Sequence, residues 1–317
     1  MISEFTSGTT RGWPAIGFLR EISWCWLAII VIGSIDIAWM RHDSIKIVGE
    51  SMIRLALLVA VLAGFSWLLR QGHPNVVKIS IARVFSPMAQ IFALMLVIAP
   101  LSYLIERLHM PLIDDSLETI DAALGFNWQN LTDFVLRYPA LEQIFFYAYL
   151  SIPIQLLVIT TICAVETRFA EIEFAQNYIL SMIACVVIGG MVPALGEPSP
   201  FQSLVHAEFE RARSGHWTIF DYSTVQGIVA FPSFHTAFPI IAVYAVRHSV
   251  PAMFGVGAIN LLMLVSIPTF GGHYLTDMIG GAVVAIASVL CIRSRFAAWH
   301  ENLLPAKGPC ASTEPMI

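Results

Sequence analysis

Two histidines late in the chain stand among residues whose types and spacing suit phosphoryl transfer. Residues 231–235 read Phe-Pro-Ser-Phe-His, and residues 271–277 read Gly-Gly-His-Tyr-Leu-Thr-Asp. An apolar stretch that predicts a helix begins at each histidine. Asp277 follows His273 by four residues, so both side chains lie on one helical face. There the carboxylate can accept the imidazole N–H and leave the other ring nitrogen free to attack.

Both helix starts also suit an anion. Pro232 presets the first helical turn, Ser233 offers a hydroxyl donor, and the unpaired N–H groups of a helix start attract phosphate. Gly272 lets the backbone approach a ligand closely before the second helix. We therefore expect two positive helix ends and two imidazoles to converge on one charged group, with Ser233 and Gly272 binding phosphate.

The composition indicates where this chemistry takes place. Hydrophobic residues make up 57% of the 317 residues and charged residues 12%, and the mean hydropathy is +0.74. This predicts an all-α, polytopic transmembrane bundle. About eight stretches approach the length that crosses ~30 Å of hydrocarbon. They are Ser23 to Met40, Met52 to Leu69, Met88 to Ile105, Ile144 to Val165, Tyr178 to Leu195, Pro232 to Arg247, Met253 to Thr269 and His273 to Ile292.

We expect a single integral membrane domain over residues 1–317, because no polar segment is long enough to bury a core of its own. Within it we distinguish N-terminal helices at 1–110, an interfacial segment at 111–143, a catalytic core at 144–295 and a flexible tail at 296–317. In the interfacial segment Ile113, Leu117, Ile120 and Leu124 line one face, and Asp114, Asp115, Glu118 and Asp121 line another. That segment is either a lid for a lipid head group or a structural collar over the helix ends.

The charges and cysteines indicate which binding partners to expect and how the chain is oriented in the membrane. The net charge of −5 without a basic run suggests no nucleic-acid partner, and no two of the five cysteines have metal-ligand spacing. We expect no metal and no cofactor. With both termini on one side, that side holds ten of the 17 Lys and Arg residues. They are Arg11, Arg20, Arg70, Lys78, Arg83, Arg168, Arg247, Arg293, Arg295 and Lys307. The termini are then cytoplasmic.

One return helix separates the two histidine motifs, so both histidines should lie on the same face of the membrane. Under the orientation above, this is the periplasmic face of a bacterial inner membrane or the lumenal face of a eukaryotic endomembrane. The sequence does not choose between these two membranes.

The motifs resemble those of the type 2 phosphatidic acid phosphatase (PAP2) superfamily of lipid phosphatases and phosphotransferases. Its Pro-Ser-Gly-His signature is matched by residues 232–235, except that Phe234 replaces the glycine. Its Ser-Arg-(five residues)-His-(three residues)-Asp signature is matched by Ser266, His273 and Asp277, with Ile267 at the arginine position. The remaining signature, Lys-(six residues)-Arg-Pro, has no match. The His-Tyr-x-x-Asp form and the turn at 193–198 look more like the branch that includes inositol phosphorylceramide synthases.

The resemblance implies roles for particular residues. His273 would be the nucleophile, Asp277 would orient it, and His235 would protonate the leaving group. Arg211 and Arg213, in the loop before the sixth expected span, are our candidates to replace the missing phosphate-binding cations. The alternative is that these arginines pair with Glu208 and Glu210 or face water.

Three function classes follow. The first is a lipid phosphatase or phosphotransferase that acts on a phosphate ester or pyrophosphate lipid through a phosphohistidine. The second is a head-group phosphotransferase, similar to inositol phosphorylceramide or sphingomyelin synthases, that moves a phospho-alcohol to a lipid hydroxyl. The third is a transporter or a lipid-binding scaffold without catalysis. The expected partners are the membrane and a lipid phosphate; the lipid, the acceptor and the oligomeric state stay open.

Overall fold

The structure is a computed structural model that describes residues 15–72, 75–166 and 170–303. Its helices are α1 (Ala15–His42), α2 (Gly49–Leu69), α3 (Val76–Glu106), α4 (Asp114–Ala123), α5 (Trp128–Leu136), α6 (Pro139–Tyr149), α7 (Ile152–Glu166), α8 (Ala170–Met191), α9 (Ser203–Arg213), α10 (Phe234–Ala245), α11 (Val250–Gly271) and α12 (Leu275–Leu303). The short strands β1 (Lys46–Ile47) and β2 (Ile219–Phe220) pair in parallel. Residues 304–317 of the expected tail lie outside the described residues, and the part before them continues α12.

The bundle is all-α and crosses the membrane several times, as expected. Among the described residues, six helices are long and apolar enough to span a membrane: α1, α2, α3, α8, α11 and α12. The pair α6 and α7 adds a seventh span if the two are counted together, and they are bent by 54° at their break. The expected span at 232–247 is present as α10, which is only 12 residues long.

The start of α10 explains its shortness. The Ser233 N–H donates to the carbonyl oxygen of Asp277 at 3.0 Å, and the rings of Phe231 and Pro232 pack against Gly280. Helix α10 therefore begins beside residues 277–281 of α12. Residue 281 lies six residues after the start of α12 at Leu275, which is ~9 Å along the helix at 1.5 Å per residue. The segment before α10 descends into the bundle before it becomes helical.

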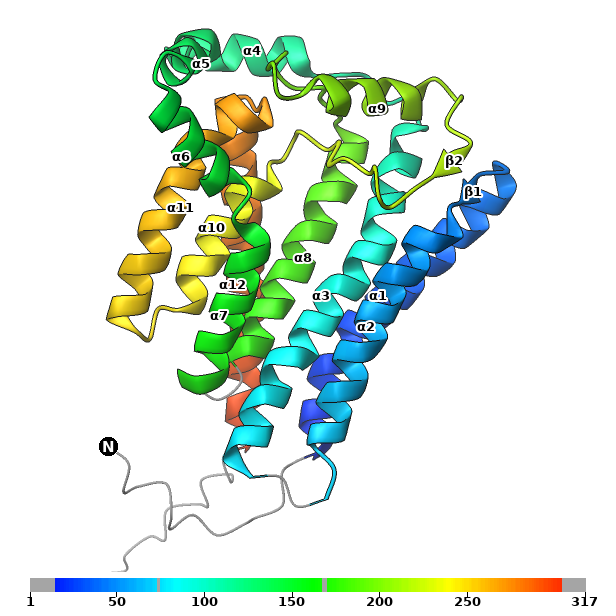
Figure 1. The fold of residues 1–317 in the computed structure, drawn as a ribbon, viewed down its shortest axis with the longest axis vertical. Coiled ribbons are helices and arrows are strands. Elements are labelled where there is room, and N and C mark those ends of the chain that lie inside the picture. The colour runs from blue at the N-terminus through cyan, green and yellow to red at the C-terminus, as the bar shows by residue number, and fades with distance from the viewer. Residues whose placement is uncertain (1–14, 73–74, 167–169, 304–317) are drawn as a thin grey trace, which may run out of the picture.

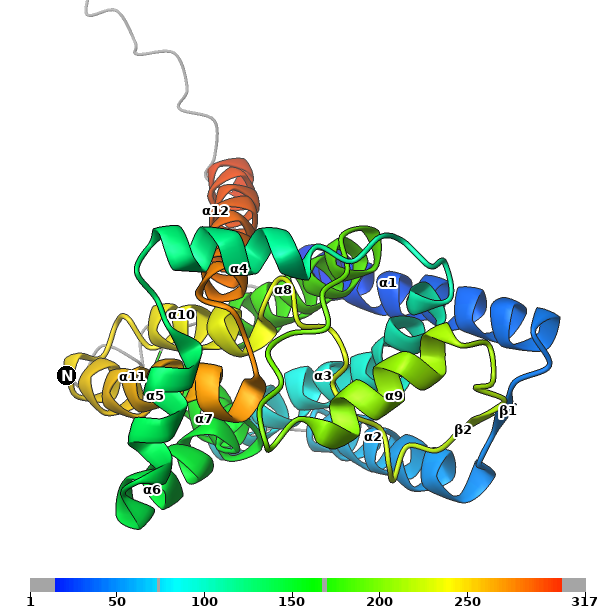
Figure 2. The ribbon, with the colours of Figure 1, turned by 90° about the horizontal axis from the view of Figure 1, so that it is seen from above.

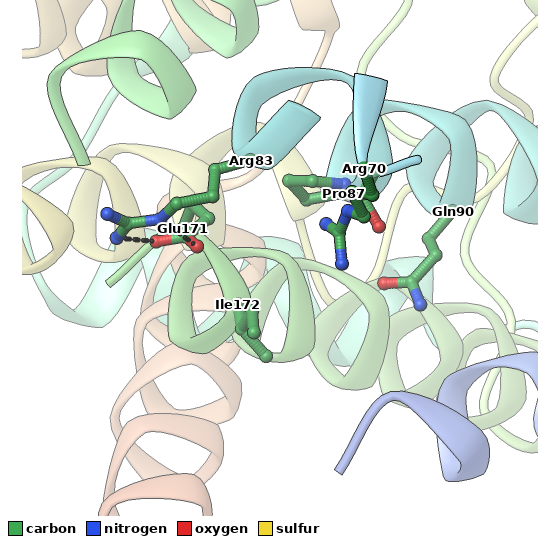
Figure 3. Close-up of a pocket in the computed structure, with 7 residues that line it drawn as sticks. Arg70, Arg83, Pro87, Gln90, Glu171 and Ile172 are labelled. Carbon is green, nitrogen blue, oxygen red and sulfur yellow. Dashed lines mark hydrogen bonds and ion pairs between the residues drawn. The ribbon is translucent and has the colours of Figure 1, made fainter. Parts of the chain in front are cut away.

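Helices α3 and α8 form the centre of the bundle, and an ion pair ties them together at one end. The guanidinium of Arg83 on α3 donates two hydrogen bonds to the carboxylate of Glu171 on α8, both at 2.7 Å (Figure 3). Toward the other end, Gly190 of α8 lies directly against the side chain of Ile105 of α3. Small residues at such crossings let helices approach closely in a membrane.

Helices α4, α5 and α9 lie across one end of the bundle and cover it (Figures 1 and 2). The sequence placed Asp121 on the polar face of α4, and that assignment is wrong. Leu117 and Asp121 are buried, whereas Ile120 and Leu124 are exposed. The buried face of α4 thus carries the Asp121 carboxylate together with Leu117, and Ile120 faces outward.

The contact at Gly190 yields a stability prediction. A methyl group in Gly190→Ala would overlap the Ile105 side chain, so the helices must separate, at a cost of about 1–3 kcal/mol. We expect a lower midpoint of thermal unfolding. The matched change Gly257→Ala in α11 meets no atom within 4 Å and should leave the midpoint unchanged or raise it. Equal midpoints for the two variants would contradict the close packing of α3 and α8.

Candidate functional site

A cavity of about 550 Å³ opens beneath the covering helices and contains both histidines. Its walls come from α3, α8, α9, α10, the α6–α7 break, the end of α11 and the segment 225–232 before α10. Its polar lining residues are Ser102, Tyr149, Gln202, Gln226, His235 and His273. No Asp, Glu, Lys or Arg of the described chain lines it. The site is therefore neutral apart from its imidazoles.

The two imidazole rings lie close together, as the motif spacing predicted. The centroids of His235 and His273 are 6.3 Å apart. Nδ1 of His273 is 3.3 Å from Oδ2 of Asp277, so Nε2 is the ring nitrogen left free. Asp277 is fully buried, and its Oδ1 has no hydrogen-bond partner among the described residues. The predicted contact between His273 and Asp277 is confirmed.

The start of α12 is not open to an anion, contrary to expectation. The backbone N–H of Tyr274 donates to Asp277 Oδ2 at 2.9 Å. The N–H groups of Leu275 and Thr276 donate to the carboxylate of Asp121 at 2.6 and 2.9 Å. Two carboxylates thus use the donors and offset the positive end of this helix. Three successive N–H groups at this helix start, those of Tyr274, Leu275 and Thr276, are therefore used within the protein and are not available to phosphate.

Asp114 binds the N-terminal end of α4 to the turn at 195–196. Its carboxylate accepts the backbone N–H groups of Leu195 and Gly196 at 2.9–3.1 Å and lies 3.4 Å from the Tyr274 hydroxyl. Together with Asp121, it binds α4 to the turn at 195–196 and to the start of α12. This arrangement is that of a collar held in place and not of a free lid.

The start of α10 keeps its donors. The N–H groups of Phe234 and His235 donate to no described residue, and both residues line the cavity. Ser233 is fully buried, its hydroxyl has no partner among the described residues, and it is not part of the lining. Among the described residues, the first N–H groups of α10 are therefore not used by carboxylates, unlike those of Tyr274, Leu275 and Thr276 at the start of α12.

The structure does not bring either candidate arginine to the cavity. Arg211 pairs with Glu208 at 3.0 Å and donates to the carbonyl of Ile219. Arg213 pairs with the buried Glu106 at 3.2 Å and donates to the carbonyl of Met110. The pair of Arg211 with Glu208 agrees with the alternative interpretation, whereas Arg213 binds Glu106 of α3, a partner that neither interpretation named.

Of the two glycines before His273, it is Gly271 that lines the cavity, and the expected Gly272 does not. A methyl group on Gly271 would lie 2.6 Å from Cδ2 of His273 and 3.2 Å from its Nε2. Gly272 adopts a left-handed conformation (φ 59°) that ends α11, and its carbonyl accepts the Glu197 N–H at 2.7 Å. Gly271 leaves room for the Nε2 edge of the imidazole, while Gly272 joins the turn at 193–198 to the site.

Tyr149 is a site residue that the sequence did not reveal. Its ring stacks on His235 with centroids 4.4 Å apart and an interplanar angle of 13°. It comes from the end of α6, where the broken span turns, and it has no motif of its own. The only signal was Pro153 shortly after it, which marks a helix irregularity.

The described residues contain no group of three or more His, Cys, Asp or Glu side chains arranged to hold a metal ion. The carboxylates near the histidines are engaged with backbone N–H groups instead. The arrangement offers one free imidazole nitrogen, a second imidazole across the cavity, and backbone donors beside it.

A family model described as the PAP2 superfamily matches residues 115–291, which is more than half of the chain. The chain belongs to the PAP2 superfamily. PAP2 members are generally phosphatases or phosphotransferases, which supports an enzyme of that type. The matched segment runs from the first turn of α4 into α12. It includes both histidine motifs and the helix that begins at each of them, α10 and α12. Comparisons with curated proteins and with solved structures gave no match.

Glu197, in the turn beside Gly272, gives this PAP2 site a pH-dependent stability. Partial burial and the carboxylates of Glu118 and Asp121 raise the pKa of Glu197 from 4.5 to about 7. Protonated Glu197 favours the folded state, so its contribution is complete below pH 4.5 and is lost as the pH rises through 7. We expect the unfolding midpoint to fall over this range. Glu197→Gln should flatten that part of the profile, and an unchanged profile would exclude this origin.

Asp121 gives a second stability prediction. In Asp121→Asn an amide N–H would face a backbone N–H of Leu275 or Thr276, and the start of α12 would lose a charged acceptor. We expect a loss of about 1–2 kcal/mol, measured by thermal unfolding of the purified protein. Asp115→Asn, at an exposed position on the same helix, is the matched control and should have no effect. Equal losses in both variants would show that Asp121 does not support the helix start.

Proposed function

We propose that this protein is a membrane lipid phosphatase or phosphotransferase that acts on a phosphate ester or pyrophosphate lipid through a phosphohistidine intermediate. The observation that carries this proposal is the pair of imidazoles, 6.3 Å apart in one cavity, with a carboxylate behind only one of them. That asymmetry gives the two histidines different tasks. No metal or cofactor takes part in the proposed steps.

In the first step the free Nε2 of His273 attacks phosphorus while the bond from phosphorus to the leaving oxygen breaks. Asp277 stabilises the imidazolium that forms, and His235 gives its proton to the departing oxygen. In the second step the acceptor, water or an alcohol, gives its proton to His235 and attacks phosphorus. The bond from phosphorus to nitrogen then breaks, and both histidines return to their starting states.

The charge of the reacting phosphate needs donors that the family arginines would otherwise supply. The N–H groups of Phe234 and His235, at the positive end of α10, are available for this task. At the position of the signature arginine, Ile267 is fully buried and apolar. Backbone donors and imidazolium therefore replace guanidinium in the proposed mechanism.

The cavity reaches the molecular surface at the break between α6 and α7. Phe146 and Leu150 line the cavity and are also exposed, on helices apolar enough to face lipid. This supports delivery of a substrate from the membrane. We place the site on the periplasmic or lumenal side, from the excess of Lys and Arg at the opposite end. Residues 144–295 would then form the catalytic core.

A second candidate, head-group transfer of the kind expected from the inositol phosphorylceramide synthase-like branch, is favoured by the neutral lining. A phosphodiester carries one negative charge, whereas a phosphomonoester carries up to two. Without a charged side chain in the lining, the single charge is the easier one to bury. In this version a lipid alcohol takes the place of water in the second step.

The roles of the histidines are tested with phosphatidic acid and a prenyl pyrophosphate, labelled in the phosphate. His273→Ala should abolish release of label and form no labelled protein. His235→Ala should slow release by about 10²–10⁴-fold. With an aryl phosphate, whose leaving group needs no proton, His235→Ala should accumulate label that is stable to base and labile to acid, as a phosphohistidine is. His248→Ala, an exposed histidine between α10 and α11, is the control and should behave as wild type.

Full activity of His273→Ala would overturn the proposal. If wild type releases no phosphate but moves labelled phosphoinositol or phosphocholine from a phospholipid to a lipid alcohol, the second candidate replaces hydrolysis. Absence of both reactions, together with binding of the lipid, would favour a scaffold.

A further inference from the structure

We propose that the inner part of the cavity is a binding well for one hydrocarbon chain of the lipid substrate, and that Phe234 forms its floor. This inference rests on the proposed function, because it deepens the description of the substrate of the same site. It starts from the cavity walls that the two-histidine chemistry does not use.

Two helical stripes line the inner part. On α3 they are Met95, Ile98, Ala99 and Ser102, and on α8 they are Met182, Cys185 and Val186. Each set follows the spacing of one helical face, so two facing helices line the same space. All of these side chains except the Ser102 hydroxyl are apolar or weakly polar, and that hydroxyl donates to its own helix at Ala99.

The depth of these stripes suits a chain and not a head group. Met95 lies 11 residues before Glu106, the end of α3, which is ~16 Å along the helix at 1.5 Å per residue. Met182 lies nine residues before Met191, the end of α8, or ~14 Å by the same rise. The well therefore descends about half of the ~30 Å hydrocarbon thickness. A charged or sugar head group would lose its hydration there, whereas a hydrocarbon chain would not.

Phe234 closes the bottom of the well. Its ring packs edge to face on Tyr178 of α8, with centroids 5.0 Å apart and an interplanar angle of 78°. Tyr178 is one turn below Met182 on the same face of α8 and is buried. Phe234 itself lines the cavity and is next in sequence to His235. The residue that replaces the signature glycine thus separates the cavity from the packed core beneath it.

The placement of Phe234 makes it the residue that sets the chain length. A chain that extends from a phosphate between the histidines into the well ends against this ring. Longer chains would have to bend or displace packed side chains. The two methionines adapt to irregular chains, since their side chains are flexible and polarizable. The well is therefore selective for length more than for unsaturation.

The first test is photocrosslinking in nanodiscs, with a phosphate lipid that carries a diazirine at the end of one chain. We expect label on Met95, Met182 or Phe234 and its disappearance with excess unlabelled lipid. The same experiment on His273→Ala, which lacks the proposed nucleophile, separates the two hypotheses. Label in the well of an inactive protein supports the well whether or not the proposed function holds. Label confined to exposed residues outside the cavity, such as Ile154 and Leu157, overturns the well even if the enzyme is active.

The second test changes the size of the side chain at Phe234. Wild type and variants receive mixtures of lipid phosphates whose chains differ by two carbons, and relative turnover is measured in competition. Phe234→Ala should raise the preference for chains beyond the wild-type optimum about tenfold, and Phe234→Trp should favour shorter ones. Phe201→Ala is the matched control, because Phe201 lines the cavity, is partly exposed, and lies against Phe270 with ring centroids 4.5 Å apart. It should change the turnover of all chains alike.

The role of Phe234 would be overturned if Phe234→Ala and Phe234→Trp both kept the wild-type length preference while thermal unfolding showed that both variants are folded. Since turnover is compared only between chains in one mixture, a general loss of activity does not imitate the expected shift.

Discussion

The site depends on Asp277 more than on any other residue. Its side chain holds His273 through Nδ1 and caps the start of α12 through the Tyr274 N–H. Its backbone carbonyl accepts the N–H of Ser233, the residue that precedes α10. One residue therefore fixes both histidine motifs relative to each other, although they are separated by a full return helix. The burial of this carboxylate strengthens each of these contacts, because little water competes for it.

The part of the site that follows from local spacing could be predicted. His273 and Asp277 stand four residues apart, and any helix brings that pair together. The apolar composition likewise predicted a helical membrane bundle, and most expected spans are present as helices. The length of α10 could not be predicted in this way. It depends on where the preceding segment packs against Gly280, and hydropathy carries no information about that contact.

What could not be predicted depends on tertiary contacts. Periodicity placed Asp121 with the other acidic residues of α4, but the unpaired N–H groups of α12 draw it inward. Tyr149 reaches His235 from a helix that ends 86 positions earlier. Arg211 and Arg213 were chosen for their charge and their side of the membrane, yet nearby carboxylates and carbonyls engage both. Sequence shows which groups need a partner, and the fold decides which partner they find.

The segment that matches the PAP2 superfamily begins at residue 115, after α3 has ended. Yet Met95, Ile98, Ala99 and Ser102 of that helix form one wall of the space in which both imidazoles lie. The two histidines and part of the cavity around them are therefore encoded in separate stretches of the chain. Substitutions in α3 can therefore change the shape of the cavity without altering His235, His273 or Asp277.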